Sequence, residues 1–387
     1  MKGCTVLGDS RVPVLDELRE RLSRRQALGG VLGMAALALT AVAEAGKKHK
    51  GKKNKKKRCK NGKKRCNGKC RNLQTDAKNC GQCGFQCAED QNCVAGVCSV
   101  PCQEFACISN QINAKRAVTS VNAMADGSLA MLAPAKYQIV VMSTTGEIER
   151  TVGKFGTAPG QLQQPLDLAV APDGTFYIAD FGAGNGSNAY ITVIPPTGPA
   201  QQINNGNEAD FTRSVGYGND KFFAADWWWM NQYDAVTRVR DDWWGYGGAH
   251  GSKFDAISGI AAGGGKIYVI NGNNPDQSGN TVGKVYCFNQ TANVPVPVDW
   301  SVGAVGSDDG EFNNASGVAV SGNRLFVADT DNRRVQVLST TDGSYLFEWT
   351  TTDRDGNEVK PESITVHPDG TIYVTAGEMI YGYTLVS

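Results

Sequence analysis

Short hydrophobic runs separated by small polar turns recur along the C-terminal part of the chain. The starts of six such runs are 47, 46, 45, 58 and 47 residues apart, and the longest interval contains the polar segment 271–280. Self-similarity at one period indicates an array of equivalent structural units. The six runs begin at Ser128, Thr175, Lys221, Lys266, Arg324 and Thr371.

Each unit contains four short β-like segments, which are clearest in the fifth unit at 315–321, 324–330, 334–340 and 344–350. Four strands per unit, repeated radially, are typical of a β-propeller, in which ring closure removes exposed sheet edges. The sixth unit has only three such segments. We therefore expect an all-β fold, a six-bladed propeller over residues 108–387, with a strand near 105–112 completing the last blade.

Segments 160–180 and 310–338 resemble the NHL repeat. They follow the pattern G-x-[FL]-x-x-P-x-x-[VIL]-A-V, with Ala315 in place of the proline in the second segment. A small turn, [FY]-[VI]-A-D and, in the second segment, N-x-R-V-Q-V follow. The match is strong in units two and five, partial in four and six, and weak in one and three. The resemblance implies four-stranded blades whose loops bind a partner, since NHL propellers mostly serve as protein or nucleic-acid platforms and a minority are lyases.

Cysteines concentrate ahead of the propeller, where ten of the twelve fall between Cys59 and Cys107. This density is typical of a small disulfide-rich module outside the cytosol. Residues 66–107 resemble the cysteine-rich motif of stigma-specific proteins through the core NCGxCGxxC, which starts at Asn79. The pairing stays open, and Cys80-x2-Cys83 as half of a zinc knuckle is a weaker alternative. The expected half-cystines are Cys59, Cys66, Cys70, Cys80, Cys83, Cys87, Cys93, Cys98, Cys102 and Cys107.

Residues 1–45 predict an export signal peptide. Ser23-Arg24-Arg25 precedes an apolar run rich in Ala and Gly, with cleavage options at Ala43 or Ala45. The pattern resembles a twin-arginine signal, and an ordinary secretory signal is the alternative. Either route predicts an exported protein, extracellular, periplasmic or on the cell surface, with no transmembrane helix in the mature chain.

Residues 46–65 predict a Lys-rich, disordered linker, since residues 47–78 carry sixteen Lys and Arg against one Asp. It either contacts an anionic cell-surface polymer or acts as a solvated spacer. Residues 79–387 carry 17 Lys and Arg against 32 Asp and Glu, a net charge of −15. This acidic balance argues against specific nucleic-acid binding by the propeller.

Five of the seven Trp residues fall within 227–244, in the third unit. Two loops that open on the same face of a blade contain them, so we expect one aromatic-acidic rim that binds a protein, peptide or glycan. Packing between blades is the alternative for some of the rings. The candidate ligand-binding residues are Trp227, Trp228, Trp229, Tyr233, Trp243, Trp244, Tyr246 and Asp226, beside Asp241 and Asp242. The recurring Asp180, Asp226 and Asp329 more simply cap loop amides.

No residue is assigned a catalytic role, and no cofactor is expected. Three His residues are too few for a zinc lyase, and Cys287 in an apolar run predicts a packed core thiol. The alternative is a calcium-dependent hydrolase of the lactonase or strictosidine-synthase kind, with Ca²⁺ held by Asn122, Asp167 and Glu362 in the central channel. The sequence thus favours an exported, non-catalytic and monomeric binding protein.

Overall fold

The structure is a computed structural model of the chain. It divides into two units, Met1–Lys57 and Arg58–Ser387. The first unit, which holds the predicted export signal, lies outside the described residues. The described residues are 59–60, 62–87, 92–94, 97–99, 103, 105–182, 189–203, 212–226, 229–245, 254, 257–272, 283–290 and 298–386.

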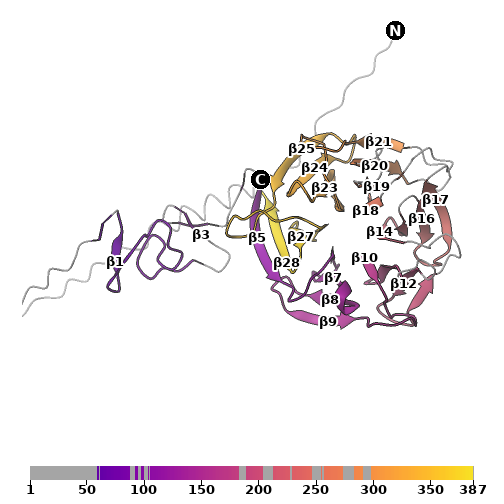
Figure 1. Ribbon diagram of the computed structural model, residues 1–387, viewed down its shortest axis with the longest axis horizontal. Helices are drawn as coiled ribbons and strands as arrows, with labels where there is room; N and C mark the ends of the chain where they lie inside the picture. Colours follow the sequence, from indigo (N-terminus) through magenta and orange to yellow (C-terminus); the bar gives the residue numbers. More distant parts are fainter. Residues whose placement is uncertain are drawn as a thin grey trace, which may run out of the picture. The chain divides into compact units, whose positions relative to one another are not determined.

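Six antiparallel four-stranded sheets form a closed ring, which confirms the predicted six-bladed all-β propeller (Figure 1). In each blade the strands follow one another from the centre outward as a, b, c and d. The innermost strand of every blade contacts the innermost strand of the next, including the contact of the sixth blade with the first. The described residues contain no α-helix, only the 3-10 turn η1 (Pro134–Lys136).

The predicted repeat positions coincide with strand b of each blade. Blade one comprises β6 (Ser120–Ala123), β7 (Leu129–Ala133), β8 (Gln138–Met142) and β9 (Ile148–Val152). Blade two comprises β10 (Pro165–Val170), β11 (Phe176–Asp180), β12 (Tyr190–Ile194) and β13 (Gln201–Ile203). Blade three comprises β14 (Ser214–Gly218), β15 (Lys221–Ala225), β16 (Trp229–Asp234) and β17 (Arg240–Gly245). Blade four comprises β18 (Ile257–Gly263), β19 (Lys266–Asn271), β20 (Lys284–Asn289) and β21 (Val298–Val302). Blade five comprises β22 (Gly317–Ser321), β23 (Arg324–Asp329), β24 (Arg334–Ser339) and β25 (Tyr345–Thr350). Blade six comprises β26 (Ser363–Val366), β27 (Ile372–Ala376), β28 (Met379–Leu385) and β5 (Ala106–Asn113).

The two ends of the propeller sequence meet in the sixth blade. Strand β5 pairs with β28 in antiparallel register from Ala106 opposite Leu385 to Asn113 opposite Met379. This confirms the prediction that a strand near 105–112 completes the blade. Cys107 lies in β5, the strand that closes the ring, and is disulfide-bonded.

The core lies between neighbouring blades, where strands b and c of one blade pack on the next. Tyr177 stacks on Phe222 with ring centroids 4.5 Å apart, and Phe222 stacks on Tyr233 at 4.6 Å. Blades three and four approach so closely that a Cβ on Gly218 would come within 2.2 Å of the carbonyl oxygen of Ala262. Only glycine fits that position.

The cysteine-rich module contains two small hairpins, β1 (Lys64–Cys66) with β2 (Lys69–Arg71) and β3 (Asn92–Val94) with β4 (Val97–Ser99). Three disulfides are described: Cys59–Cys70, Cys66–Cys83 and Cys80–Cys93.

These bonds overturn the zinc alternative, because Cys80 and Cys83 belong to two different disulfides. Cys87 is also bonded. The side chain of Cys98 and all of Cys102 lie outside the described residues. Cys59, in the range expected to be linker, is part of the bonded module.

Within the described part of the chain, no helix is long and apolar enough to cross a membrane.

Candidate ligand-binding face

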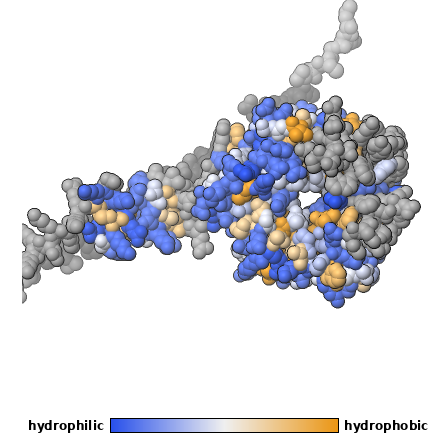
Figure 2. All heavy atoms as spheres, viewed as in Figure 1, coloured by the Kyte–Doolittle hydropathy of each residue, from blue (hydrophilic) through white to orange (hydrophobic). Residues whose placement is uncertain are grey.

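The connections between strands open on two opposite sides of the ring. Because the strands are antiparallel, the b-to-c and d-to-a connections share one side, which we call the loop face. Asp180, Asp226 and Asp329 follow or end strand b there, and Trp229 begins strand c of blade three on the same side. Hydrophobic residues form small separate patches among hydrophilic ones on the described surface in Figure 2.

The innermost strands of all six blades surround a central cavity of about 190 Å³. This is smaller than ordinary small-molecule sites, which span roughly 300–1,000 Å³. Its polar lining consists mainly of hydroxyl and amide side chains, with Asp167 as the one acidic side chain: Ser120, Asn122, Asp167, Ser258, Ser316, Ser363 and Thr365.

Asp167 joins the inner strands of three blades. Its Oδ1 accepts hydrogen bonds from the Ser120 hydroxyl at 2.6 Å and the Leu168 amide at 2.8 Å. Its Oδ2 accepts from the Ser214 hydroxyl at 3.0 Å and the Val215 amide at 2.9 Å. Burial raises the pKa of this carboxyl group, and the four donors oppose that shift. Both oxygens are therefore occupied in holding blades one, two and three together.

Hydroxyl groups make similar contacts between other blades. Ser258 donates to the carbonyl oxygen of Ala315 at 2.7 Å, and Ser316 donates to the carbonyl oxygen of Glu362 at 2.6 Å. The amide of Val121 donates to the Ser363 hydroxyl at 3.1 Å, which connects blade six with blade one. The inner polar residues thus form inter-blade contacts.

The three side chains predicted for Ca²⁺ each have a hydrogen-bond partner in the protein. Asn122 donates its side-chain amide to the carbonyl oxygen of Leu168 at 2.7 Å. Glu362 is exposed, and its Oε2 lies 3.5 Å from the amide of Gly377 within blade six. The described residues contain no group of three or more His, Cys, Asp or Glu side chains that could hold a metal ion.

Arg213 adds positive charge beside this region. It directly precedes Ser214, which contacts Asp167, and its guanidinium carbon lies 5.8 Å from the centroid of the Phe181 ring. Burial lowers the pKa of Arg213. A cation at this position disfavours Ca²⁺ binding electrostatically.

Two aspartates at the ends of strands b fix the d-to-a loops, as expected. Asp180, 1% exposed, accepts hydrogen bonds from the amides of Gln163 at 2.9 Å and Gln164 at 2.7 Å. Asp329, fully buried, accepts from the amide of Asn313 at 2.7 Å. These carboxylates satisfy loop amides that would otherwise be buried without partners.

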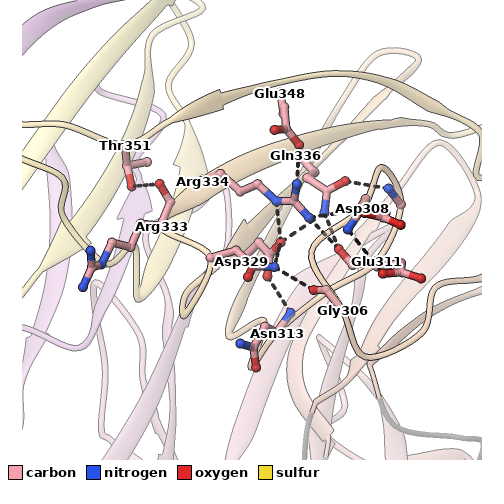
Figure 3. Close-up of polar contacts among 12 residues, drawn as sticks. Gly306, Asp308, Glu311, Asn313, Asp329, Arg333, Arg334, Gln336, Glu348 and Thr351 are labelled. Carbon is pink, nitrogen blue, oxygen red and sulfur yellow. Dashed lines mark hydrogen bonds and ion pairs between the residues drawn. The ribbon is translucent and has the colours of Figure 1, made fainter.

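Blade five extends this cap into an ionic network that sequence reasoning did not identify (Figure 3). Arg334 Nε donates to Asp329 Oδ2 at 2.7 Å, and its Nη1 donates to Glu348 Oε2 at 2.8 Å. Its Nη2 donates to the carbonyl oxygens of Asp308 at 3.1 Å and Glu311 at 2.9 Å. Burial raises the pKa of Glu348, opposed by Arg334. The network ties the loop between blades four and five to strands c and d.

Blade three replaces this network with a short turn. Asp226 accepts a hydrogen bond from the amide of Trp229 at 2.5 Å and donates its own amide to the Trp229 carbonyl oxygen at 2.9 Å. Trp229 begins β16 and is half-buried. The Asp226 carboxylate thus caps its own turn, while Trp229 keeps part of its surface accessible.

Of the other predicted rim residues, one is buried, two are described in their backbone alone, and three lie outside the described residues. Tyr233 is fully buried and stacks on Phe222, so it packs between blades and is not part of a rim. Its pKa is raised by burial. Trp243 and Trp244 lie in β17 opposite Asn231 and Met230, and their side chains are outside the described residues. Trp227, Trp228 and Tyr246 are outside them entirely.

A second pocket on the loop face, between blades one and two, was also missed. It has a volume of about 560 Å³. Phe155, the one exposed aromatic residue in its loop, was a signal that could have located it. The pocket is lined by Thr119, Pro134, Tyr137, Phe155, Gln163, Gln164, Pro165, Leu166 and Gly182.

Comparison with known families agrees with the two resemblances. Residues 42–101 match the stigma-specific STIG1-like protein family, and residues 312–338 match the NHL repeat. The search of curated protein sequences found no significant match. The twin-arginine signal stays a prediction.

Solved propeller structures are similar at low identity. The β-propeller domain of Cps50 (Swd1) from Myceliophteria thermophila is 14% identical, covers 73% of this chain and 100% of its own, and has a TM-score of 0.48. A streptogramin B lyase is 11% identical, with 73% and 98% covered and a TM-score of 0.48. The WD40 repeats of RRP9 are 10% identical, with 74% and 99% covered and a TM-score of 0.49. Identities this low carry no information about function.

Proposed function

We propose that this protein is an exported, non-catalytic binding protein whose propeller presents a protein, peptide or glycan site on its loop face. The observation that carries the proposal is the fixation of that face. Asp180 and Asp329 anchor two d-to-a loops to the strands below them. Binding residues on loops held by a rigid scaffold are the usual arrangement for recognition.

The aromatic residues of blade three supply the recognition chemistry in this proposal. Trp229 is half-buried at the start of β16, and Trp243 and Trp244 lie in the neighbouring strand β17. Aromatic faces beside carboxylates such as Asp226 bind sugar rings, peptide chains and cations well. The described disulfides support export, because such bonds persist in oxidising compartments.

The basic segment 46–65 adds a second, electrostatic contact in this proposal. Lysines in an extended linker bind anionic cell-surface polymers with an affinity that falls as salt rises. Binding of the oxidised protein to such a polymer should therefore weaken between low and physiological ionic strength. A chain lacking residues 46–57 should lose that salt dependence, whereas an unchanged profile would assign the linker to a spacer role.

Tryptophan fluorescence of the oxidised protein, titrated with a panel of wall glycans and peptides, tests the loop face directly. A ligand-dependent change should disappear in Trp228→Ala or Trp243→Ala. Trp300→Phe is the matched control, since Trp300 lies in strand d of blade four. A ligand response that survives both tryptophan variants would contradict the proposed rim.

Calcium titration of the same protein tests the alternative. A Ca²⁺-dependent rise in melting temperature that is lost in both Asp167→Ala and Glu362→Ala would favour a lactonase-type hydrolase and overturn the non-catalytic assignment. Asp167→Ala alone is not decisive, because the variant also breaks the contacts with Ser120 and Ser214.

A further inference from the structure

The pocket between blades one and two is formed by two loops of blade one and the start of blade two. Pro134 and Tyr137 come from the b-to-c connection, Phe155 from the d-to-a loop, and Pro165 and Leu166 from β10. Its volume of about 560 Å³ falls within the range of sites that bind ligands. The central cavity, at about 190 Å³, does not.

The backbone around Phe155 is fixed by hydrogen bonds, while the residue is 62% exposed. The amide of Leu162 donates to the carbonyl oxygen of Lys154 at 2.9 Å, and the amide of Gly156 donates to that of Leu162 at 3.1 Å. The Phe155 ring meets the Tyr137 ring edge-on, with centroids 4.8 Å apart. An exposed aromatic ring on a fixed backbone is a typical anchor for a binding partner, because little entropy is lost when it is covered.

Two glutamines supply the polar groups of the pocket. The backbone amides of Gln163 and Gln164 are taken by the buried Asp180, which fixes the backbone at this wall. Their side-chain amides make no hydrogen bond to any other described residue and remain available as both donors and acceptors. Proline and aromatic walls with a few such amides suit an extended peptide, whose main chain needs both kinds of partner.

Basic residues lie next to lining residues of the pocket in the sequence, whereas the domain as a whole is acidic. Lys136 ends η1 beside Tyr137, Lys154 precedes Phe155, and Arg116 donates to the side chain of Gln138 at 3.2 Å. None of the three forms an ion pair with another residue that the structure describes. Residues 79–387 carry a net charge of −15, so this basic border stands out and favours an acidic partner.

We propose that this pocket binds an extended segment of another protein in which a proline or aromatic residue is followed by acidic residues. The inference rests on the proposed binding function of the loop face and adds a site and a peptide class to it. The apolar side chain packs against Phe155 and Tyr137, the Gln163 and Gln164 amides bond the peptide main chain, and Lys136 and Lys154 face the carboxylates.

The test uses the full oxidised chain and fluorescently labelled synthetic peptides with a proline-tyrosine pair followed by glutamates. Anisotropy should show binding that weakens with salt. Phe155→Ala should reduce affinity about tenfold, as expected for loss of an aromatic anchor. Lys136→Glu with Lys154→Glu should reduce affinity further and flatten the salt dependence. Val305→Ala, at the equivalent place in the loop between blades four and five and 48% exposed, is the matched control and should bind normally.

Several outcomes would overturn the inference. One is a Phe155→Ala variant that binds the peptide with unchanged affinity and has an unchanged melting temperature. Another is a peptide with lysines in place of the glutamates that binds the native protein equally well. Peptide binding that is lost only in Trp228→Ala or Trp243→Ala would reject this pocket and keep the proposed function. Binding of glycans alone would do the same, whereas the absence of any peptide or glycan ligand would reject both proposals.

Discussion

Blades five and three place different chemistry on equivalent hairpins. In blade five Asp329 pairs with Arg334, whereas in blade three Asp226 is bonded to Trp229. Four residues separate the first pair and two separate the second. The shorter turn leaves an aromatic residue where blade five has its buried cation.

The two hairpins show that the same position after strand b can hold either a buried ion pair or a partly exposed aromatic residue. In blade five the Arg334 side chain is 8% exposed and makes four hydrogen bonds, to Asp329, Glu348 and two loop carbonyl oxygens. Such a network fixes a loop. In blade three the carboxylate of Asp226 accepts the amide of Trp229, and Trp229 stays half-buried. Blade five therefore stabilises the loop face with an ionic network, and at the equivalent place blade three has a half-buried aromatic residue.

Among the variants that test this difference between the blades, Arg334→Ala should lose the most stability. The variant leaves the buried Asp329 carboxylate without its cation, which typically costs about 3–5 kcal/mol of unfolding free energy. Urea unfolding measures this loss. Arg333→Gln is the control, because the Arg333–Glu358 pair is exposed and contributes at most about 1 kcal/mol. Equal losses in the two variants would show that the network does not stabilise blade five.

The sequence predicts repetition well and side-chain partnerships poorly. The six strands b and the closing strand β5 follow from period, alternation and turns, which are local signals. Arg334 escapes such reasoning because its partners Asp308 and Glu348 come from a different loop and strand. Tyr233 was misassigned for the same reason, since its burial depends on Phe222 in the neighbouring strand.

The channel residues show the same limit. The repeat pattern predicts equivalent inner positions for Asp167 and Glu362 and hence a shared cation site. In the structure Asp167 lies opposite Ala179, whereas Ser363, one residue after Glu362, lies opposite the equivalent Thr375. The contacts of Asp167 with Ser120 and Ser214 depend on the blades either side of it, and no periodicity reveals them. The three undescribed members of the predicted rim, Trp227, Trp228 and Tyr246, stay predictions.

Asp167→Asn should have the next largest effect and tests whether the inner ring is structural. An amide can accept at only one atom, so one donor, such as the Val215 amide, loses its acceptor at a cost of about 1–3 kcal/mol. Asp173→Asn in the exposed a-to-b turn of the same blade is the control and should change stability little.

The stability lost in Asp167→Asn should also depend on pH. Because the pKa of Asp167 is raised in the folded protein, the folded state binds the proton more tightly than the unfolded state. The contribution of Asp167 to stability is therefore full below the unfolded pKa, near 4, and declines as pH rises towards the folded pKa. The difference between the native protein and Asp167→Asn should shrink over that window in thermal melts. A difference that grows instead would mean that the four donors outweigh burial.

The smallest effect should come from Asp226→Ala, which probes the blade-three side of the comparison. Its carboxylate accepts the Trp229 amide, so loss of this hydrogen bond should cost about 1 kcal/mol. Asp329→Ala, at the equivalent position, should cost several times more because it removes the fully buried one of the two carboxylates that pair with Arg334 in the interior. Urea unfolding of both variants measures the ratio. Equal costs would mean that Asp226 contributes as much to the stability of blade three as Asp329 contributes to blade five, and the contrast between the two blades would fail.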